Sequence, residues 1–328
     1  MGKGPRVGMI FDRKNHLAAF FALVLLLAAA VSAGLFFGSE TISFGTLNET
    51  QAAILYQIRL PRVLLGACVG ACLAVSGAAL QALLRNPLAE PYLLGVSNGA
   101  ALGTMLAFVF FAAFGFSRPL MAFAGALLAT GAVYRIARSK AGMSVERLVL
   151  SGVIVTTFLS SIIILLTTLL DATRLRSFTF WLLGDLSQAT YTGFYLTLAA
   201  AVIGTVLLTS QARALNLMMV GERDALDFGV EVGKTRGIVF LTASAMVGLS
   251  VAASGSVGFV GLIVPHLVRL ATGSDNRTVL PFSALFGAAF VVVADTAART
   301  LISPRELPVG AITALIGCPL FIFLLKRN

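Results

Sequence analysis

The sequence is short of charge. Only 12% of its 328 residues are Asp, Glu, Lys or Arg, whereas 58% are hydrophobic. A water-soluble domain carries about 25% charged residues, because charge covers its surface. The shortage therefore excludes an ordinary soluble globular protein and indicates a chain that exposes apolar side chains to lipid.

Residues that build catalytic and metal centres are scarce as well. The chain has two histidines, His16 and His266, and three cysteines, Cys68, Cys72 and Cys318. No cysteine belongs to a CxxC pair or lies near a histidine in the sequence, so we interpret all three as small packing residues. The sequence also contains no GxxxxGK[ST] phosphate loop and no HExxH motif. A membrane-embedded enzyme is therefore the weakest interpretation, because no nucleophile, base or metal set converges.

Long apolar runs fill the chain instead. Residues 17–38 and 63–84 each contain 22 residues without a charge, and about 20 suffice to cross a membrane. The first run could also be a secretory signal peptide, but it exceeds the usual apolar core of about 7–15 residues. The eighth run is short, so we expect a broken or re-entrant helix there. We predict ten spans, at 17–38, 63–84, 93–114, 119–137, 147–170, 194–209, 238–255, 259–271, 280–300 and 307–325.

The basic residues predict an orientation. If the ten spans alternate from a cytoplasmic N-terminus, 17 of the 24 Lys and Arg residues lie on the cytoplasmic side and 7 on the other. This asymmetry follows the positive-inside rule and predicts that both termini are cytoplasmic. Because the basic residues are scattered over short loops, we interpret the net charge of +10 as membrane-surface anchoring and not as nucleic-acid binding.

The largest polar stretch, residues 210–237, is predicted on the cytoplasmic side. Apolar residues interleave its charges at spacings that favour two short helices with a break at Gly221. A solvated connector is one interpretation. We favour a docking surface, because an exposed Leu-Met-Met-Val run requires a partner to cover it.

Four charged residues stand near the opposite side. Arg59 and Arg62 are three apart at the start of the second span, where Pro61 suits a first helical turn. They could anchor to lipid phosphates or form a basic dock for an acidic partner. Asp295 and Arg299 are four apart in the ninth span, and we expect them to pair with each other. Arg299 could still extend one nitrogen outward to join the dock.

Small and hydroxyl side chains mark two spans. Gly66 and Gly70 form a GxxxG pattern that predicts close helix packing. The fifth span is rich in hydroxyls, which could line a wet pathway or bond back to their own helix. We favour packing for both features. The hydroxyl residues are Ser151, Thr156, Thr157, Ser160, Ser161, Thr167 and Thr168.

Longer motifs carry a family resemblance. They are Arg59-Leu60-Pro61-Arg62, Asn86 to Pro91, Leu94 to Ala100, Gly258 to His266 and Glu306 to Gly310. In this order they resemble the FecCD family of ABC importer permeases, which moves iron–siderophores, haem and vitamin B12. The resemblance covers nearly the whole chain.

The resemblance implies an all-α integral membrane protein with the type II ABC importer permease fold. One permease domain would occupy residues 1–328, with about ten transmembrane helices per subunit, in the bacterial inner membrane. It also implies a homodimer, or a pair of similar permeases, with the substrate path along the fifth and tenth spans. Two cytoplasmic ATPase subunits would bind ATP and Mg, a periplasmic or lipoprotein binding protein would deliver the substrate, and this chain would hold no cofactor.

Functional residues carry over by position. The resemblance implies that Arg59, Arg62 and Arg299 receive glutamates of the binding protein, and that Ser160, Ser161, Thr167 and Thr168 lie along the path. The motif Asp227-Phe228 departs from the family pattern. The stretch from Trp181 to Asp185 resembles the family in position, but Asp185 does not decide the substrate. The residues implied in ATPase coupling are Leu215, Asn216, Gly221, Glu222, Asp224, Ala225, Phe228 and Gly229.

The leading hypothesis is therefore the permease subunit of an ABC importer for a large metal chelate. A ferric siderophore or haem is the first choice of substrate, vitamin B12 the second, and a molybdate-type oxyanion a further alternative. The alternative of another class is an ion-coupled secondary transporter or channel. A proton-driven carrier usually has carboxylates inside the membrane, and Asp295 is the one candidate in the predicted spans.

Overall fold

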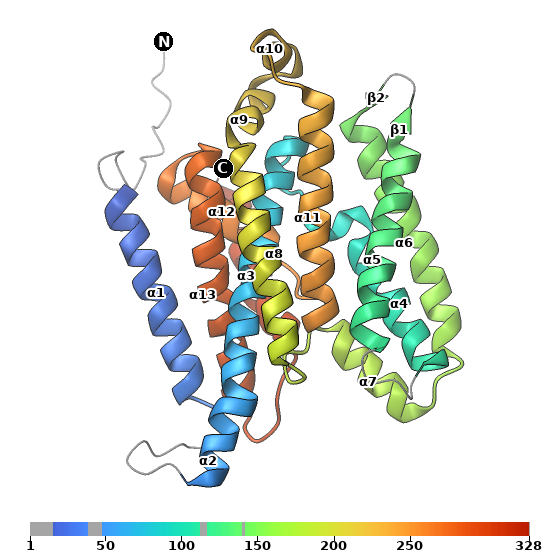
Figure 1. Ribbon diagram of the computed structural model, residues 1–328, viewed down its shortest axis with the longest axis vertical. Coiled ribbons are helices and arrows are strands. Elements are labelled where there is room, and N and C mark those ends of the chain that lie inside the picture. Colours follow the sequence, from blue (N-terminus) through green and yellow to red (C-terminus); the bar gives the residue numbers. More distant parts are fainter. Residues whose placement is uncertain (1–15, 39–47, 112–116, 140–141, 328) are drawn as a thin grey trace.

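The computed structural model describes residues 16–38, 48–111, 117–139 and 142–327, and helices dominate it (Figure 1). Within this part of the chain, seven helices are long and apolar enough to cross a membrane, and three shorter apolar helices accompany them. The long ones are α1 (His16–Phe36), the continuous helix Glu49–Leu84, α5 (Ser117–Ala137), α6 (Val145–Thr167), α8 (Tyr191–Ser210), α11 (Val232–Ser254) and α13 (Asn276–Thr300). The shorter ones are α4 (Val96–Phe110), α12 (Val260–Thr272) and α14 (Val309–Arg327). The ten predicted spans and the all-α membrane fold are thus confirmed, including the short eighth span.

The second span begins earlier than predicted. Its helix runs without interruption through α2 (Glu49–Ala53), the π-helical turn η2 (Ile54–Arg59) and α3 (Leu60–Leu84). The prediction started at residue 63 because Arg59 and Arg62 interrupt the uncharged run. Both arginine side chains are buried in the protein, so their charges do not end the helix.

Two further segments differ from the prediction. The third span is shorter because residues 91–94 form the 3₁₀-helix η3 (Pro91–Leu94), and Gly95 follows with a positive φ of 77°. An additional helix, α7 (Ala172–Leu182), lies between the fifth and sixth spans. Its polar sequence gave no apolar run to detect, but Asp171 caps it by accepting the N–H of Arg174.

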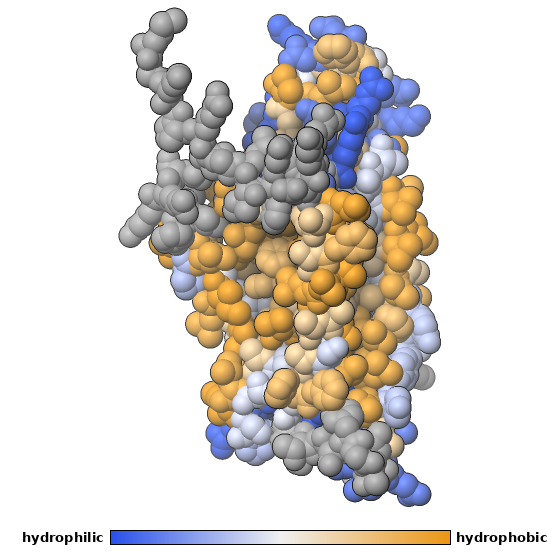
Figure 2. Space-filling view, turned by 90° about the vertical axis from the view of Figure 1, so that its left-hand side faces the viewer, coloured by the Kyte–Doolittle hydropathy of each residue, from blue (hydrophilic) through white to orange (hydrophobic). Residues whose placement is uncertain are grey.

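The bundle has two ends (Figure 1), and both are polar (Figure 2). At one end, which we call the α10 end, lie α9 (Ala212–Val220), α10 (Glu222–Asp227) and the small hairpin of β1 (Arg138–Ser139) and β2 (Gly142–Met143). At the other, the α7 end, lie α2 and α7. Figure 2 shows an apolar band between two hydrophilic ends. A multi-pass membrane protein requires this arrangement, because lipid covers the band and water the ends.

Helix α3 forms the centre of the bundle. It packs against α8, α11, α12 and α13, and most of its side chains are buried. A Cβ atom added at Gly70 would lie 2.1 Å from the carbonyl oxygen of Gly287 in α13, and one at Gly77 would lie 2.0 Å from that of Gly261 in α12. The close approach predicted from the Gly66–Gly70 pattern is therefore confirmed at Gly70.

Non-helical backbone inside the bundle is held by polar side chains. The carboxylate of Glu90 accepts the N–H of Phe259 at 2.9 Å, and Phe259 has a φ of 68°. The hydroxyl of Tyr92 donates to the carbonyl of Val257 and accepts its N–H. These bonds provide hydrogen-bond partners for backbone N–H and C=O groups that lie just before the short helix α12 and outside any helix.

The contact at Gly70 predicts a stability difference between two glycine variants. Gly70→Ala should lower the unfolding free energy by about 2 kcal/mol, because the methyl group meets backbone and the helices must separate. Gly131→Ala in α5 is the matched control, since nothing lies within 4 Å of its Cβ position. It should be neutral or stabilising by about 0.5–1 kcal/mol. Thermal unfolding in detergent measures both, and equal shifts would contradict the packing described here.

Candidate docking and coupling sites

A cluster of five charged residues lies at the α7 end of the bundle. The carboxylate of Asp295 in α13 lies between two arginines: it forms ion pairs with Arg62 Nη2 at 3.0 Å and with Arg299 Nε at 3.1 Å. Arg62 also donates from Nε to both Asp295 oxygens, at 3.1 Å each. A second ion pair joins Arg62 Nη1 to Glu306 at 2.7 Å.

Two arginines of the cluster, Arg59 and Arg299, close the end of α1. Arg59 Nη1 donates to the carbonyl oxygens of Leu35 at 3.0 Å and Phe36 at 3.1 Å. Arg299 Nη2 donates to the carbonyl oxygen of Gly34 at 3.0 Å. The last carbonyls of a helix have no partners within it and attract positive charge. The cluster therefore fastens α1 to α3 and α13.

Burial distinguishes the members of the cluster. Arg59, Arg62, Arg299 and Asp295 are only 2–4% exposed, whereas the side chain of Glu306 is 37% exposed. The sequence suggested arginines that face outward, and in this structure all three are buried. Glu306 is therefore the member of the cluster that is most accessible from solvent.

Part of this cluster was visible in the sequence. The predicted pair of Asp295 and Arg299 is confirmed. The sequence analysis missed that Arg62, 233 positions away, shares Asp295, and that Glu306 binds Arg62. One signal was available: after Asp275, Asp295 and Glu306 are the only acidic residues of the chain.

The polar stretch at the α10 end folds as predicted, into two short helices with Gly221 between them. Leu215 and Ala225 are fully buried and anchor α9 and α10. The side-chain oxygen of Asn216 accepts the N–H of Asn276 at 2.9 Å, and its amide nitrogen donates to Asp275 at 2.7 Å. These bonds fix α9 to the beginning of α13.

Glu222 connects α10 to two spanning helices. Its carboxylate pairs with Arg236 in α11, whose side chain is 7% exposed, and with Arg85 at 3.3 Å. Arg85 caps the end of α3 in a left-handed conformation with a φ of 49°. A displacement of α10 would therefore pull on α3 and α11 together.

The outer surface of this segment is exposed and partly apolar. Val220 is 76% exposed, Leu226 58% and Phe228 68%. Arg223, Asp224 and Asp227 are exposed beside them, and Gly229 follows with a φ of 77° and open space around it. Large apolar side chains among charges, at a polar end of the bundle, are typical of a protein-binding surface.

Several hydroxyls in and just after α6 bond back to its own backbone. Ser161 donates to the carbonyl of Thr157, Thr167 to that of Ile164 and Thr168 to that of Leu165. Ser160 instead accepts from Asn98 of α4. The exposed side of α6 also carries large apolar residues such as Phe158 and Leu165, which are 65% and 70% exposed. This side of the helix therefore offers an apolar surface with hydroxyls among its side chains.

In the part of the chain that the structure describes, no group of three or more His, Cys, Asp or Glu side chains could hold a metal ion. The three cysteines are unpaired, with Cys68 and Cys72 buried and Cys318 exposed.

The chain is similar to known proteins over nearly its whole length. Residues 20–327 match the model of the FecCD transport family. The chain is 42% identical to the cobalamin import system permease protein BtuC of Halobacterium salinarum, over 90% of this chain and 81% of that one. It is 38% identical to the hemin transport system permease protein HmuU of Yersinia pestis, over 95% and 96%. A solved structure of an ABC transporter assigned to the metal-chelate type, in an inward-facing conformation, superposes with a TM-score of 0.85 at 32% identity and covers 95% of this chain and 100% of that one.

The arginine cluster predicts an unequal cost for its two carboxylates. Asp295→Asn should destabilise the protein by about 3–5 kcal/mol, because two buried arginines lose their counter-charge. Glu306→Gln should cost about 1 kcal/mol or less, since a partly exposed ion pair contributes little. Denaturation of the two purified variants under identical detergent conditions measures the difference. Equal stability of the two variants would contradict the central role of Asp295.

Proposed function

The chain belongs to the FecCD transport family of ABC transporter permeases, and from this we propose that it forms the membrane path of a binding-protein-dependent importer for a metal chelate. The observation that carries the proposal is the family match over residues 20–327, which includes both end clusters. The chain itself performs no covalent chemistry. ATP and Mg would bind to separate ATPase subunits.

We place the chain in the inner membrane of a bacterium, with its α10 end facing the cytoplasm. The excess of basic residues on that side supports this orientation. Two ATPase subunits would contact the exposed residues around Val220, Leu226 and Phe228, whose apolar surfaces need a cover. Closure of the ATPase pair would then push α10, and Glu222 would pass the movement to α3 and α11 through Arg85 and Arg236.

A substrate-binding protein would dock at the α7 end. The charged cluster there contains three arginines and two carboxylates, so it keeps one surplus positive charge. An acidic group of the binding protein could take the place of Glu306 on Arg62, because Glu306 is the exposed member. Arg59 and Arg299 would add attraction at short range.

A second copy of the chain would complete the path. The exposed side of α6, with Thr157, Phe158, Ser161, Leu165 and Thr168, supplies an apolar surface with hydroxyls. Such a surface passes a bulky ligand without binding it strongly. The two copies would rock against each other and open the path alternately to each side.

Ferric siderophore or haem is the substrate we propose, and vitamin B12 is the runner-up. Relatives named for hemin and for cobalamin support one choice each. The metal-chelate assignment of the similar solved structure fits the first choice. All these ligands are bulky chelates, so an apolar path suits each of them.

Reconstitution tests the function. The permease, purified with the ATPase that remains bound to it, is placed in proteoliposomes and supplied with a ferric chelate or vitamin B12. We expect uptake that requires ATP and the binding protein. Uptake by the permease alone under a proton or sodium gradient would instead establish the secondary transporter and overturn the proposal.

The docking role predicts a specific effect of Arg59. Arg59→Gln should weaken binding of the substrate-binding protein about tenfold at low salt, because one positive charge at the dock is removed. The amide can still donate to the carbonyls of Leu35 and Phe36, so the fold should persist. Arg305→Gln is the matched control, since Arg305 is an exposed arginine between α13 and α14.

Surface plasmon resonance at low and high salt measures both variants. The difference between them should shrink at high salt, which screens the attraction between the cluster and an acidic partner across the intervening solvent. Unchanged affinity of Arg59→Gln at low salt would show that Arg59 serves only to cap α1.

A further inference from the structure

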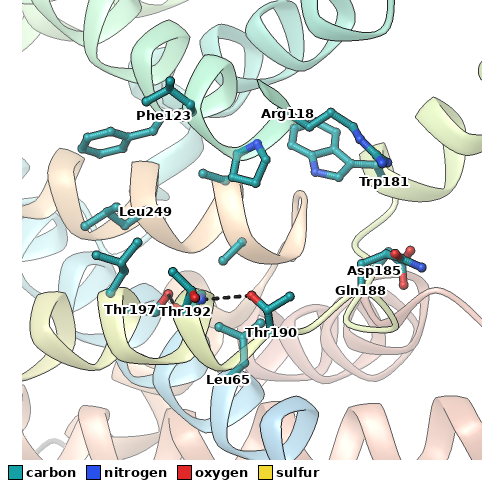
Figure 3. A pocket seen from close by; sticks show the side chains of 16 residues that line it. Leu65, Arg118, Phe123, Trp181, Asp185, Gln188, Thr190, Thr192, Thr197 and Leu249 are labelled. Carbon is teal, nitrogen blue, oxygen red and sulfur yellow. Dashed lines mark hydrogen bonds between the residues drawn. The ribbon is translucent and has the colours of Figure 1, made fainter. Parts of the chain in front are cut away.

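A groove of about 470 Å³ lies between α5, α8 and α11 toward the α7 end of the bundle (Figure 3). Figure 1 shows these three helices side by side at the front of the molecule. The volume falls in the range of sites for small molecules, about 300–1,000 Å³. All three helices are long and apolar enough to span a membrane, and the groove is open at Leu120 and Leu196, which are 57% and 51% exposed, so a lipid can reach it from the side.

One part of the groove is apolar. Its walls include Phe123 of α5, Leu249 of α11 and Leu196 of α8. Phe123 and Leu249 are half-buried, whereas Leu196 is 51% exposed. Figure 3 shows Phe123 and Leu249 at the side of the groove that lies away from Asp185 and Gln188. An alkyl chain fits this part, because its apolar surface is removed from water there.

The other part of the groove carries two opposite charges. Arg118 and Asp185 both line it, and Figure 3 shows them on the same side, with Trp181 and Gln188 close by. Arg118 is exposed and its guanidinium lies 5.3 Å from the ring centre of Phe108. Asp185 accepts the N–H of Ser187. Neither side chain belongs to an ion pair among the described residues.

We propose that this groove binds one phospholipid with a zwitterionic, primary-ammonium head group, such as phosphatidylethanolamine, from the leaflet at the α7 end. The phosphate pairs with Arg118, since guanidinium groups bind phosphate through charge-assisted hydrogen bonds. The ammonium pairs with Asp185, and an acyl chain lies along Phe123, Leu196 and Leu249. Charge and hydrogen bonding explain the choice of head group. An anionic lipid would satisfy Arg118 but would face the carboxylate of Asp185, and the quaternary ammonium of phosphatidylcholine has no N–H to donate to that carboxylate.

This site is independent of the import function proposed above. Lipid binding is measured without ATP, substrate or any partner protein. The lipid-binding proposal can therefore be tested even if the permease fails to transport a metal chelate.

Native mass spectrometry of the intact permease tests the proposal. The protein is delipidated in detergent and titrated with phosphatidylethanolamine, phosphatidylglycerol or phosphatidylcholine. The wild type should retain one phosphatidylethanolamine in preference to the other two. Arg118→Ala should weaken that retention about tenfold, through loss of the phosphate contact.

Two further variants examine the rest of the site. Asp185→Asn should shift the preference from phosphatidylethanolamine toward phosphatidylglycerol, because the carboxylate that repels an anionic head group is gone. Leu196→Trp should abolish retention of every lipid by filling the apolar part. Leu196 is exposed, so this larger side chain should not disturb folding, and an unchanged thermal midpoint verifies that.

Arg176→Ala is the matched control. Arg176 in α7 also lies over a phenylalanine ring, at 5.8 Å from the centre of Phe180, but it does not line the groove. Its retention of lipid should equal that of the wild type. Equal losses in Arg118→Ala and Arg176→Ala, or equal retention of all three lipids, would overturn the proposal. Self-crosslinking of Leu196→Cys in a Cys318→Ser background would also overturn it, since a second copy of the chain would then occupy the groove.

Discussion

The shared carboxylate of Asp295 is the interaction on which one end of this protein depends. Three arginines are buried within the same few turns, and removing such charges from water costs several kcal/mol for each ion. Asp295 offsets that cost for Arg62 and Arg299 at once. The carbonyls at the end of α1 offset it for Arg59. As a result α1, α3 and α13 are joined at this end by charge, although small side chains and glycines hold α3 and α13 together elsewhere.

At the α10 end a carboxylate is again shared by two arginines, and the desolvation cost is smaller. Glu222 is shared by Arg85 and Arg236, but Arg85 and Glu222 are themselves partly exposed. An exposed ion pair contributes little energy, so this junction can break and form more easily than the one at Asp295. The bundle thus has a rigid charged joint at the α7 end and a looser one at the α10 end. Under the proposed function, the looser joint is the one next to the ATPase subunits.

Local sequence patterns predicted what depends on local physics. Uncharged runs predicted the ten spans, because a helix in lipid must satisfy its own backbone and present apolar side chains. The break at Gly221 and the close approach at Gly70 followed from residue size and backbone freedom. The pair of Asp295 and Arg299 followed from their spacing of four. The same reasoning placed the start of the second span too late, because a rule based on uncharged runs treats every arginine as exposed.

The sequence by itself determined the number of spans, the two polar ends and the family, since each is written in composition or in contiguous motifs. Only the tertiary structure decided that Arg62 meets Asp295 and Glu306, that Glu90 and Tyr92 hold the backbone around Phe259, and that Arg118 and Asp185 line one groove. The physical reason is the same in each case. These partners lie far apart in the chain, and side-chain charge carries no information about its partner until packing brings the helices together.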